Sequence, residues 1–140
     1  MDGERTTYLQ VIQEPISRMS TNSAIFKGFA ATIVAGVAAL SYGEVNTWIL
    51  GLSFLPVITF LILDVYYLRL ERRYRLLYEQ VRKGEHPVDF SLNLPSDRAE
   101  LKQAKARIWD CIWSPSILLF YPLLIAVLLI VLVMKVGGAL

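Results

Sequence analysis

The sequence predicts an all-α integral membrane protein with three transmembrane helices, at about residues 24–42, 47–68 and 116–136. The first reason is composition, since 55% of the 140 residues are hydrophobic, against roughly 45–50% in ordinary soluble domains. The second is the stretch 117–134, whose eighteen residues include no charged side chain. As a helix it would cover roughly 27 Å, close to the roughly 30 Å of a bilayer core. A soluble helical bundle is the alternative, but this stretch has no polar face to turn toward water.

The third reason is the distribution of positive charge. Ten of the fourteen lysines and arginines lie between Arg69 and Arg107, in the segment that joins the second apolar stretch to the third. Lysine and arginine in short segments beside a span resist translocation, so we expect this segment in the cytoplasm. The turn 43–46 has a glutamate but no lysine or arginine, which favours the outside. The predicted topology has a cytoplasmic N-terminus and an outside C-terminus, with 1–140 as a single membrane domain that includes the cytoplasmic helical segment 69–113.

Residues 6–20 are predicted to form an N-terminal amphipathic helix, because apolar residues recur at spacings of three, four and three. Pro15 is expected to bend or divide this helix. The segment 20–23, Ser-Thr-Asn-Ser, is a cluster of capping residues that marks the start of the first span. The apolar residues that set the period are Leu9, Ile12, Ile16 and Met19.

The first span is rich in small residues, and Ala31, Ala35 and Ala39 fall on one face at four-residue spacing. Small residues allow helix backbones to approach closely in a membrane. We therefore expect this helix to be the one most enclosed by its neighbours.

The second span contains Pro56, where a kink is expected, and continues without a breaker as a helix to Gly84. Beyond the span, apolar residues repeat at three, four, three and four residues, as in a heptad stripe. Two interpretations stay open: the stripe packs on its own chain, or it joins a second copy or a soluble partner. The stripe consists of Tyr67, Leu70, Tyr74, Leu77 and Val81.

Residues 84–96 form a turn-rich linker, and a helix at about 97–113 follows, capped by Asp97 or Ser96. Together with the preceding helix it makes a cytoplasmic helical hairpin. Trp109 and Trp113 come where the chain returns to the membrane, as in an aromatic belt.

Lys27 and Asp64 are the ionisable residues inside the first two spans, and both fall in the cytoplasmic half of an antiparallel hairpin. Pairing would spare each charge part of an insertion cost of about 2.5–3.5 kcal/mol. Alternatively, Lys27 extends to the headgroups and Asp64 lies at a wet helix end. A role in handling protons or ions is the third interpretation.

Four arginines on the helical extension are candidate contacts of anionic lipid headgroups. The simpler interpretation is that their charge only determines topology. These residues are Arg69, Arg72, Arg73 and Arg75.

Several classes of function have no support in the sequence. Cys111 is the only cysteine and His86 the only histidine, which disfavours thiolate and paired-histidine metal sites. No nucleophile, phosphate-loop or paired-carboxylate motif is present, so we expect neither an enzyme nor a cofactor. A net charge of +2 gives no reason to expect nucleic acid as a partner.

The segments 12–19, 22–28 and 64–78 carry three motifs, IQEPISRM, NSAIFKG and DVYYLRLERRYRLLY, and in these motifs the chain resembles a family of small bacterial multi-pass membrane proteins. Their pattern is an IQ-x-x-I-x-RM-type helix, then NS-x-x-x-KG, then D-x-Y-x-L-x-x-E-R-x-Y-R-x-LY. The resemblance implies a bacterial inner-membrane location. Small membrane proteins of this architecture occur in bacterial defence systems as effectors that permeabilise the membrane, which is an analogy at the level of fold. Matching positions here are Ile12, Gln13, Ile16, Arg18, Met19, Asn22, Ser23, Lys27, Gly28, Asp64, Tyr66, Leu68, Glu71, Arg72, Tyr74, Arg75, Leu77 and Tyr78.

Two functions follow as expectations. The first is an oligomeric membrane-perturbing effector or small channel, in which several copies build what three spans cannot enclose alone. The second is a non-enzymatic adaptor that holds a soluble partner through its cytoplasmic helices. A lone transporter ranks last, because no inverted repeat or broken helix pair is visible.

Overall fold

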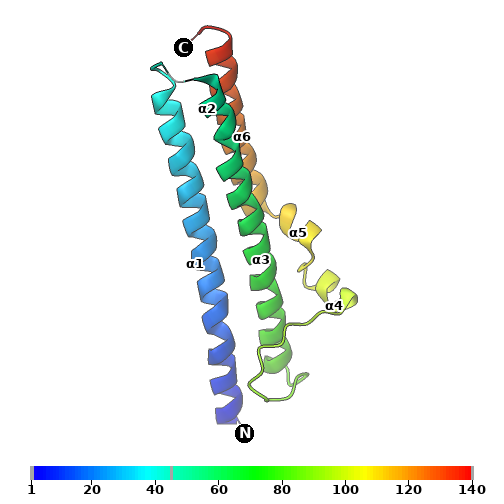
Figure 1. The fold of residues 1–140 in the computed structure, drawn as a ribbon. Coiled ribbons are helices and arrows are strands. Elements are labelled where there is room, and N and C mark those ends of the chain that lie inside the picture. Colours follow the sequence, from blue (N-terminus) through cyan, green and yellow to red (C-terminus); the bar gives the residue numbers. More distant parts are fainter. Residues whose placement is uncertain (1, 45, 140) are drawn as a thin grey trace. The chain divides into compact units, whose positions relative to one another are not determined.

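The computed structural model describes residues 2–44 and 46–139, and all the regular structure in them is helical (Figure 1). This confirms the predicted all-α class. Three stretches are long and apolar enough to cross a membrane, Asp2–Leu40, Thr47–Arg82 and Arg98–Val136. Each corresponds to one predicted span, although the first ends at Leu40 rather than at 42. In chain order the helices are α1 (Asp2–Leu40), α2 (Thr47–Leu52), α3 (Phe54–Arg82), α4 (Arg98–Gln103), α5 (Ile108–Ile112) and α6 (Pro115–Val136).

The chain divides into two compact units. The polar unit comprises Met1–Ser23 and Val65–Ile112, and the apolar unit comprises Ala24–Asp64 and Trp113–Leu140. Of the 26 charged residues, 22 belong to the polar unit. The boundaries between the units fall close to the cytoplasmic ends predicted for the three spans. The four charged residues of the apolar unit are Lys27, Glu44, Asp64 and Lys135.

Helix α1 runs without interruption through both Pro15 and the capping cluster 20–23. The predicted division into an amphipathic helix and a separate span is therefore wrong. Serine, threonine and asparagine favour a helix start where one is needed, but inside a helix each costs less than about 1 kcal/mol relative to alanine. Pro15 removes a single backbone hydrogen bond, and the bonds on either side keep the helix continuous.

The small-residue face of α1 does not pack inside the apolar unit. Ala35 and Ala39 are exposed, while Ala30 and Val34 are buried. Only 11% of the most apolar part of α1 is buried, compared with 28% and 17% in the other two stretches. The expectation that this helix is the most enclosed is wrong. Small residues permit close approach, but they supply little contact area to hold a neighbour.

The bend expected at Pro56 takes the form of a helix break at Ser53, between α2 and α3. Pro56 has no N–H to donate to the Leu52 carbonyl, and its ring crowds that oxygen, so the helix restarts one turn earlier. Downstream, α3 continues to Arg82 as predicted. Gly84 ends it with φ +78, and the Glu85 N–H bonds the Gln80 carbonyl at 2.9 Å, the Schellman pattern that glycine favours.

The single helix predicted for 97–113 is two short helices, α4 and α5. Lys105 has φ 54, and the Ala106 N–H closes α4 on the Leu101 carbonyl at 2.8 Å. Arg72 Nη1 donates to the freed Lys105 carbonyl at 2.7 Å. This bond between residues distant in sequence stabilises a left-handed residue that local propensity would not predict.

Helix α2 packs against α6 within the apolar unit (Figure 1). Lys135, near the end of α6, donates to the backbone oxygens of Ser41 at 3.2 Å and Gly43 at 2.6 Å. The cation thereby satisfies carbonyls that follow the C-terminus of α1. The buried apolar side chains of this unit are Ala30, Val34, Leu50, Val57, Ile117, Tyr121 and Leu128.

Large apolar side chains cover the outside of the apolar unit. Leu119 is 75% exposed, and Trp48, beside the first turn, is 78% exposed. Others on this surface are Phe29, Leu40, Leu52, Leu55, Ile62, Leu123, Ile130 and Val133.

Candidate functional site

One polar cluster joins all three long helices of the apolar unit. The Lys27 ammonium on α1 donates to Asp64 Oδ2 on α3, forming an ion pair. The Tyr121 hydroxyl on α6 donates to the same Asp64 oxygen at 2.9 Å and lies 3.3 Å from the Phe60 carbonyl. Lys27 Nζ also stands 5.8 Å from the centroid of the Tyr121 ring, a cation–π distance.

Burial makes this cluster energetically important. The side chains of Asp64 and Tyr121 are 0% exposed, whereas that of Lys27 is 19% exposed. A buried carboxylate is tolerated only where donors satisfy it, and here an ammonium and a hydroxyl converge on one oxygen. The sequence-predicted residues Lys27 and Asp64 are therefore in direct contact, and their contact ties α1 to α3.

Tyr121 is the third member of the cluster, and it was not among the residues predicted from the sequence. Its signal was a lone hydroxyl inside the apolar stretch 117–134. A buried tyrosine needs a hydrogen-bond partner for its hydroxyl, so a polar residue of another span was to be expected opposite it.

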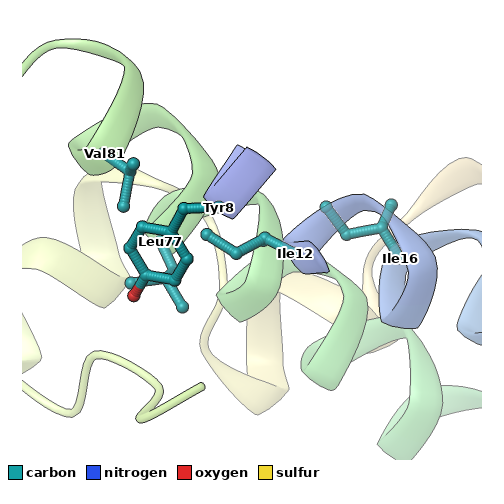
Figure 2. Close-up of a cluster of buried hydrophobic side chains, with 5 residues drawn as sticks. All are labelled: Tyr8, Ile12, Ile16, Leu77 and Val81. Atoms are coloured by element: carbon teal, nitrogen blue, oxygen red, sulfur yellow. The ribbon is translucent and has the colours of Figure 1, made fainter. Parts of the chain in front are cut away.

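The apolar stripe on α3 packs largely on its own chain. Leu77 and Val81 are fully buried against three residues of α1, namely Tyr8, Ile12 and Ile16 (Figure 2). Tyr74 packs on the edge of this cluster, while Tyr67 and Leu70 are partly buried and lie outside it. Leu77 and Val81 thus have no surface left for a second copy or a partner.

Tyr8 also fastens the linker between α3 and α4. Its hydroxyl lies 2.5 Å from the Ser91 carbonyl and 3.2 Å from Asp89 Oδ1. Its ring stands 5.3 Å from the ring of Phe90, which adopts φ 55. Burial raises the pKa of the Tyr8 hydroxyl, while the Ser91 backbone N–H lowers the pKa of the Asp89 carboxyl.

The four candidate lipid-contacting arginines differ in what they bind. Arg72 donates to the Lys105 carbonyl, Arg73 to the Pro95 carbonyl at 3.1 Å, and Arg75 pairs with Glu71 at 2.8 Å. Arg69 makes no such bond, and its Nε is buried without a hydrogen-bond partner.

Two adjoining cavities of about 410 Å³ each lie in the polar unit, and both are lined by Gln80, Glu85 and Glu100. His86 lines the second cavity, with Nδ1 2.8 Å from the Pro87 carbonyl. Within the described part of the chain, no three histidine, cysteine or acidic side chains gather closely enough to hold a metal ion. Cys111 is a buried free thiol on α5.

Comparison with protein-family models, with curated proteins and with solved structures found no match to this chain. The resemblance to small bacterial membrane proteins therefore stays a prediction, and a functional proposal rests on the geometry of the chain.

Proposed function

We propose that this chain is an integral membrane protein of three spans, with its N-terminus and polar unit in the cytoplasm and its C-terminus outside. The observation that carries this is the surface of the apolar unit, which exposes large apolar side chains on α1, α3 and α6. Soluble monomers rarely expose contiguous apolar patches beyond a few hundred Å². Lipid tails are the solvent that such a surface suits.

The distribution of charge and aromatic residues supports the orientation. Twelve of the fourteen lysines and arginines belong to the polar unit, which the positive-inside rule assigns to the cytoplasm. Tyr42 and Trp48 are exposed at one end of the apolar unit, and Trp113 is exposed where α6 begins. These residues suit the two interfaces of a bilayer. A bacterial inner membrane is the compartment that the family resemblance favours.

Cysteine labelling tests this topology. In a Cys111→Ala background, single cysteines are placed at Glu44 and at Glu85, both exposed. In intact cells an impermeant maleimide is expected to label the cysteine at position 44 only. After lysis it is expected to label the cysteines at both positions. Labelling of position 85 in intact cells would contradict the proposed orientation.

We further propose that copies of the chain associate and perturb the membrane. The support is the small-residue face of α1, which points away from the buried side of the unit. Ala35 and Ala39 on it are exposed, and a Cβ added at Gly28 or Gly36 would meet nothing within 4 Å. Such a face lets two helices approach closely. The buried side chains of one unit are mainly apolar, with a few serines and the ion pair among them, so we place the pathway between copies.

The test pairs two substitutions of the same kind. Ala35→Leu blocks the small face, while Ala126→Leu adds the same bulk at an exposed site on α6. The variants are expressed in bacteria, where crosslinking reports oligomers and a dye reports membrane potential. Wild-type and Ala126→Leu protein are expected to form oligomers and to depolarise the membrane. Ala35→Leu protein is expected to do neither. Depolarisation that persists in Ala35→Leu would refute assembly through this face.

The second candidate is an adaptor, favoured by the two adjoining polar cavities between α3, the linker and α4. Their carboxylates Glu85 and Glu100 make them suited to a basic segment of a soluble partner. A monomer that leaves membrane potential unchanged and retains a soluble protein only while these carboxylates are intact would favour this function over the effector.

A further inference from the structure

Arg69 has a buried hydrogen-bond donor for which the folded chain supplies no acceptor. Within residues 2–44 and 46–139, one buried side-chain nitrogen or oxygen has no hydrogen-bond partner, and it is Arg69 Nε. The neighbouring Arg72, Arg73 and Arg75 all donate to acceptors of the chain. A buried donor on a charged group is costly when unsatisfied, and arginine cannot lose its proton to escape that cost. Nε itself is closed to outside molecules, but Arg69 as a whole is only partly buried, so the terminal nitrogens of its guanidinium are open to an acceptor from outside the chain.

The surroundings of Arg69 favour an anion. Arg69 and Arg72 are three residues apart and share a face of α3, and the charges of both act on the buried Cys111 thiol of α5. Two carboxylates of this region already have partners, since Arg107 Nε binds Asp110 at 3.0 Å and Arg75 binds Glu71 at 2.8 Å. Arg107 chiefly lowers the pKa of the Asp110 carboxyl, and the charge of Arg72 adds to this effect. Neither carboxylate is thus left to neutralise Arg69 or Arg72.

The position of Arg69 along α3 indicates which anion. It comes five residues after Asp64, the last residue of this helix in the apolar unit, a rise of roughly 7.5 Å. The headgroup layer on each side of a bilayer is about 5–8 Å thick. Phosphate is the acceptor concentrated at that depth, and it matches the planar fork of arginine. Trp109, 66% exposed on α5, suits the same interface.

We propose that Arg69, assisted by Arg72, binds the headgroup phosphate of an anionic phospholipid at the cytoplasmic face. This inference rests on the proposed membrane topology. Zwitterionic lipid is the weaker ligand, because its ammonium would meet the same two guanidinium charges.

The test uses full-length Trp48→Phe protein, in which Trp109 and Trp113 are the remaining tryptophans. It is reconstituted in phosphatidylcholine bilayers containing equal fractions of brominated phosphatidylglycerol or brominated phosphatidylcholine. We expect an apparent preference for the glycerol lipid of about fivefold, the ratio for one basic group at an anionic surface. Arg69→Gln should abolish the preference, and Arg98→Gln, at an exposed arginine of α4, should retain it.

Each outcome separates the two proposals. Quenching by neither brominated lipid would overturn the membrane topology itself. Equal quenching by both, or a preference that survives Arg69→Gln, would overturn the lipid site and leave the topology intact. If Arg69→Gln fails to reconstitute, Arg69→Lys replaces it, and since lysine lacks the bidentate fork, an undiminished preference would again overturn the site.

A second arm distinguishes a lipid from free phosphate. In detergent, short-chain phosphatidylglycerol is expected to raise the thermal midpoint of the wild-type chain but not of Arg69→Gln. Inorganic phosphate at the same concentration should have no such effect. Equal stabilisation by inorganic phosphate would overturn the assignment to a lipid headgroup.

Discussion

Removing the positive charge of Lys27 is expected to destabilise the protein more than removing the negative charge of Asp64. Both residues form the ion pair in the apolar unit, but their burial differs. Asp64 is 0% exposed, so Lys27→Gln leaves a carboxylate in the interior without its cationic donor, although the Tyr121 hydroxyl remains. Lys27 is 19% exposed, so after Asp64→Asn its long side chain is able to reach the headgroups.

The magnitudes follow from the interactions that each substitution removes. Breaking a buried pair by deleting one partner costs about 3–5 kcal/mol, which we assign to Lys27→Gln. Asp64→Asn keeps an acceptor for Tyr121 and removes mainly the charge-assisted bond, for about 1.5–3 kcal/mol. The double variant removes both charges together, so its cost should approach that of Asp64→Asn alone. The coupling between the two sites then approaches the cost assigned to Lys27→Gln, about 3–5 kcal/mol.

Equilibrium unfolding of the purified protein in mixed detergent micelles, followed by circular dichroism, measures these differences. The matched control is the cycle of Glu79→Gln and Arg82→Gln, whose ion pair is on the helix surface at 2.6 Å and should couple by only about 0.2–0.5 kcal/mol. Additive losses at Lys27 and Asp64 would refute the reasoning, as would a larger loss from Asp64→Asn than from Lys27→Gln.

Three further predictions concern the rest of the chain. Ile12→Ala, in the fully buried cluster, should cost roughly 2–5 kcal/mol in unfolding experiments, while Val11→Ala at the adjacent exposed site should cost little; equal losses would argue against the packing of α1 on α3. Lys135→Met removes the donor to the Ser41 and Gly43 carbonyls and should speed amide exchange at the end of α1, an effect that Lys135→Arg should largely prevent. The pKa of Asp89 is lowered in the folded state, chiefly by the Ser91 N–H, so this bond contributes fully above the unfolded-state pKa of about 3.9 and is lost as pH falls through the lower folded value. Exchange of that N–H should therefore accelerate only in acid, and Asp89→Asn should remove the pH dependence.

Much of the fold was predictable because it depends on local chemistry. The length and polarity of the apolar stretches predicted the three long helices, since backbone bonding and side-chain hydropathy act within each segment. Pro56 predicted a kink and Gly84 a helix end, because proline has no backbone N–H to donate and glycine readily adopts the positive φ that ends a helix. The depths of Lys27 and Asp64 in an antiparallel hairpin made their pairing one of three interpretations, and the structure shows that they pair.

Other features were not predictable because they depend on interactions between distant segments. The break between α4 and α5 at residues 104–107 is stabilised by the hydrogen bond from Arg72 to the Lys105 carbonyl. No residue within this segment predicts such a break. The cluster 20–23 looks like a cap, yet α1 continues through it, because capping residues are tolerated inside a helix. The sequence did not indicate whether the α3 stripe packs on its own chain or on another, because periodicity locates an apolar face but not the surface that packs against it.

By itself, the sequence determined that the chain is helical, which three segments are long and apolar enough to cross a membrane, and where positive charge gathers. These properties belong to single segments and need no neighbour. Only the tertiary structure decided that Tyr121 completes the Lys27–Asp64 pair, that Leu77 and Val81 pack on Tyr8 and Ile12, and that Arg69 is left without an acceptor for its Nε. Burial and hydrogen bonding are shared between side chains far apart in sequence, so they exist only once the helices have packed.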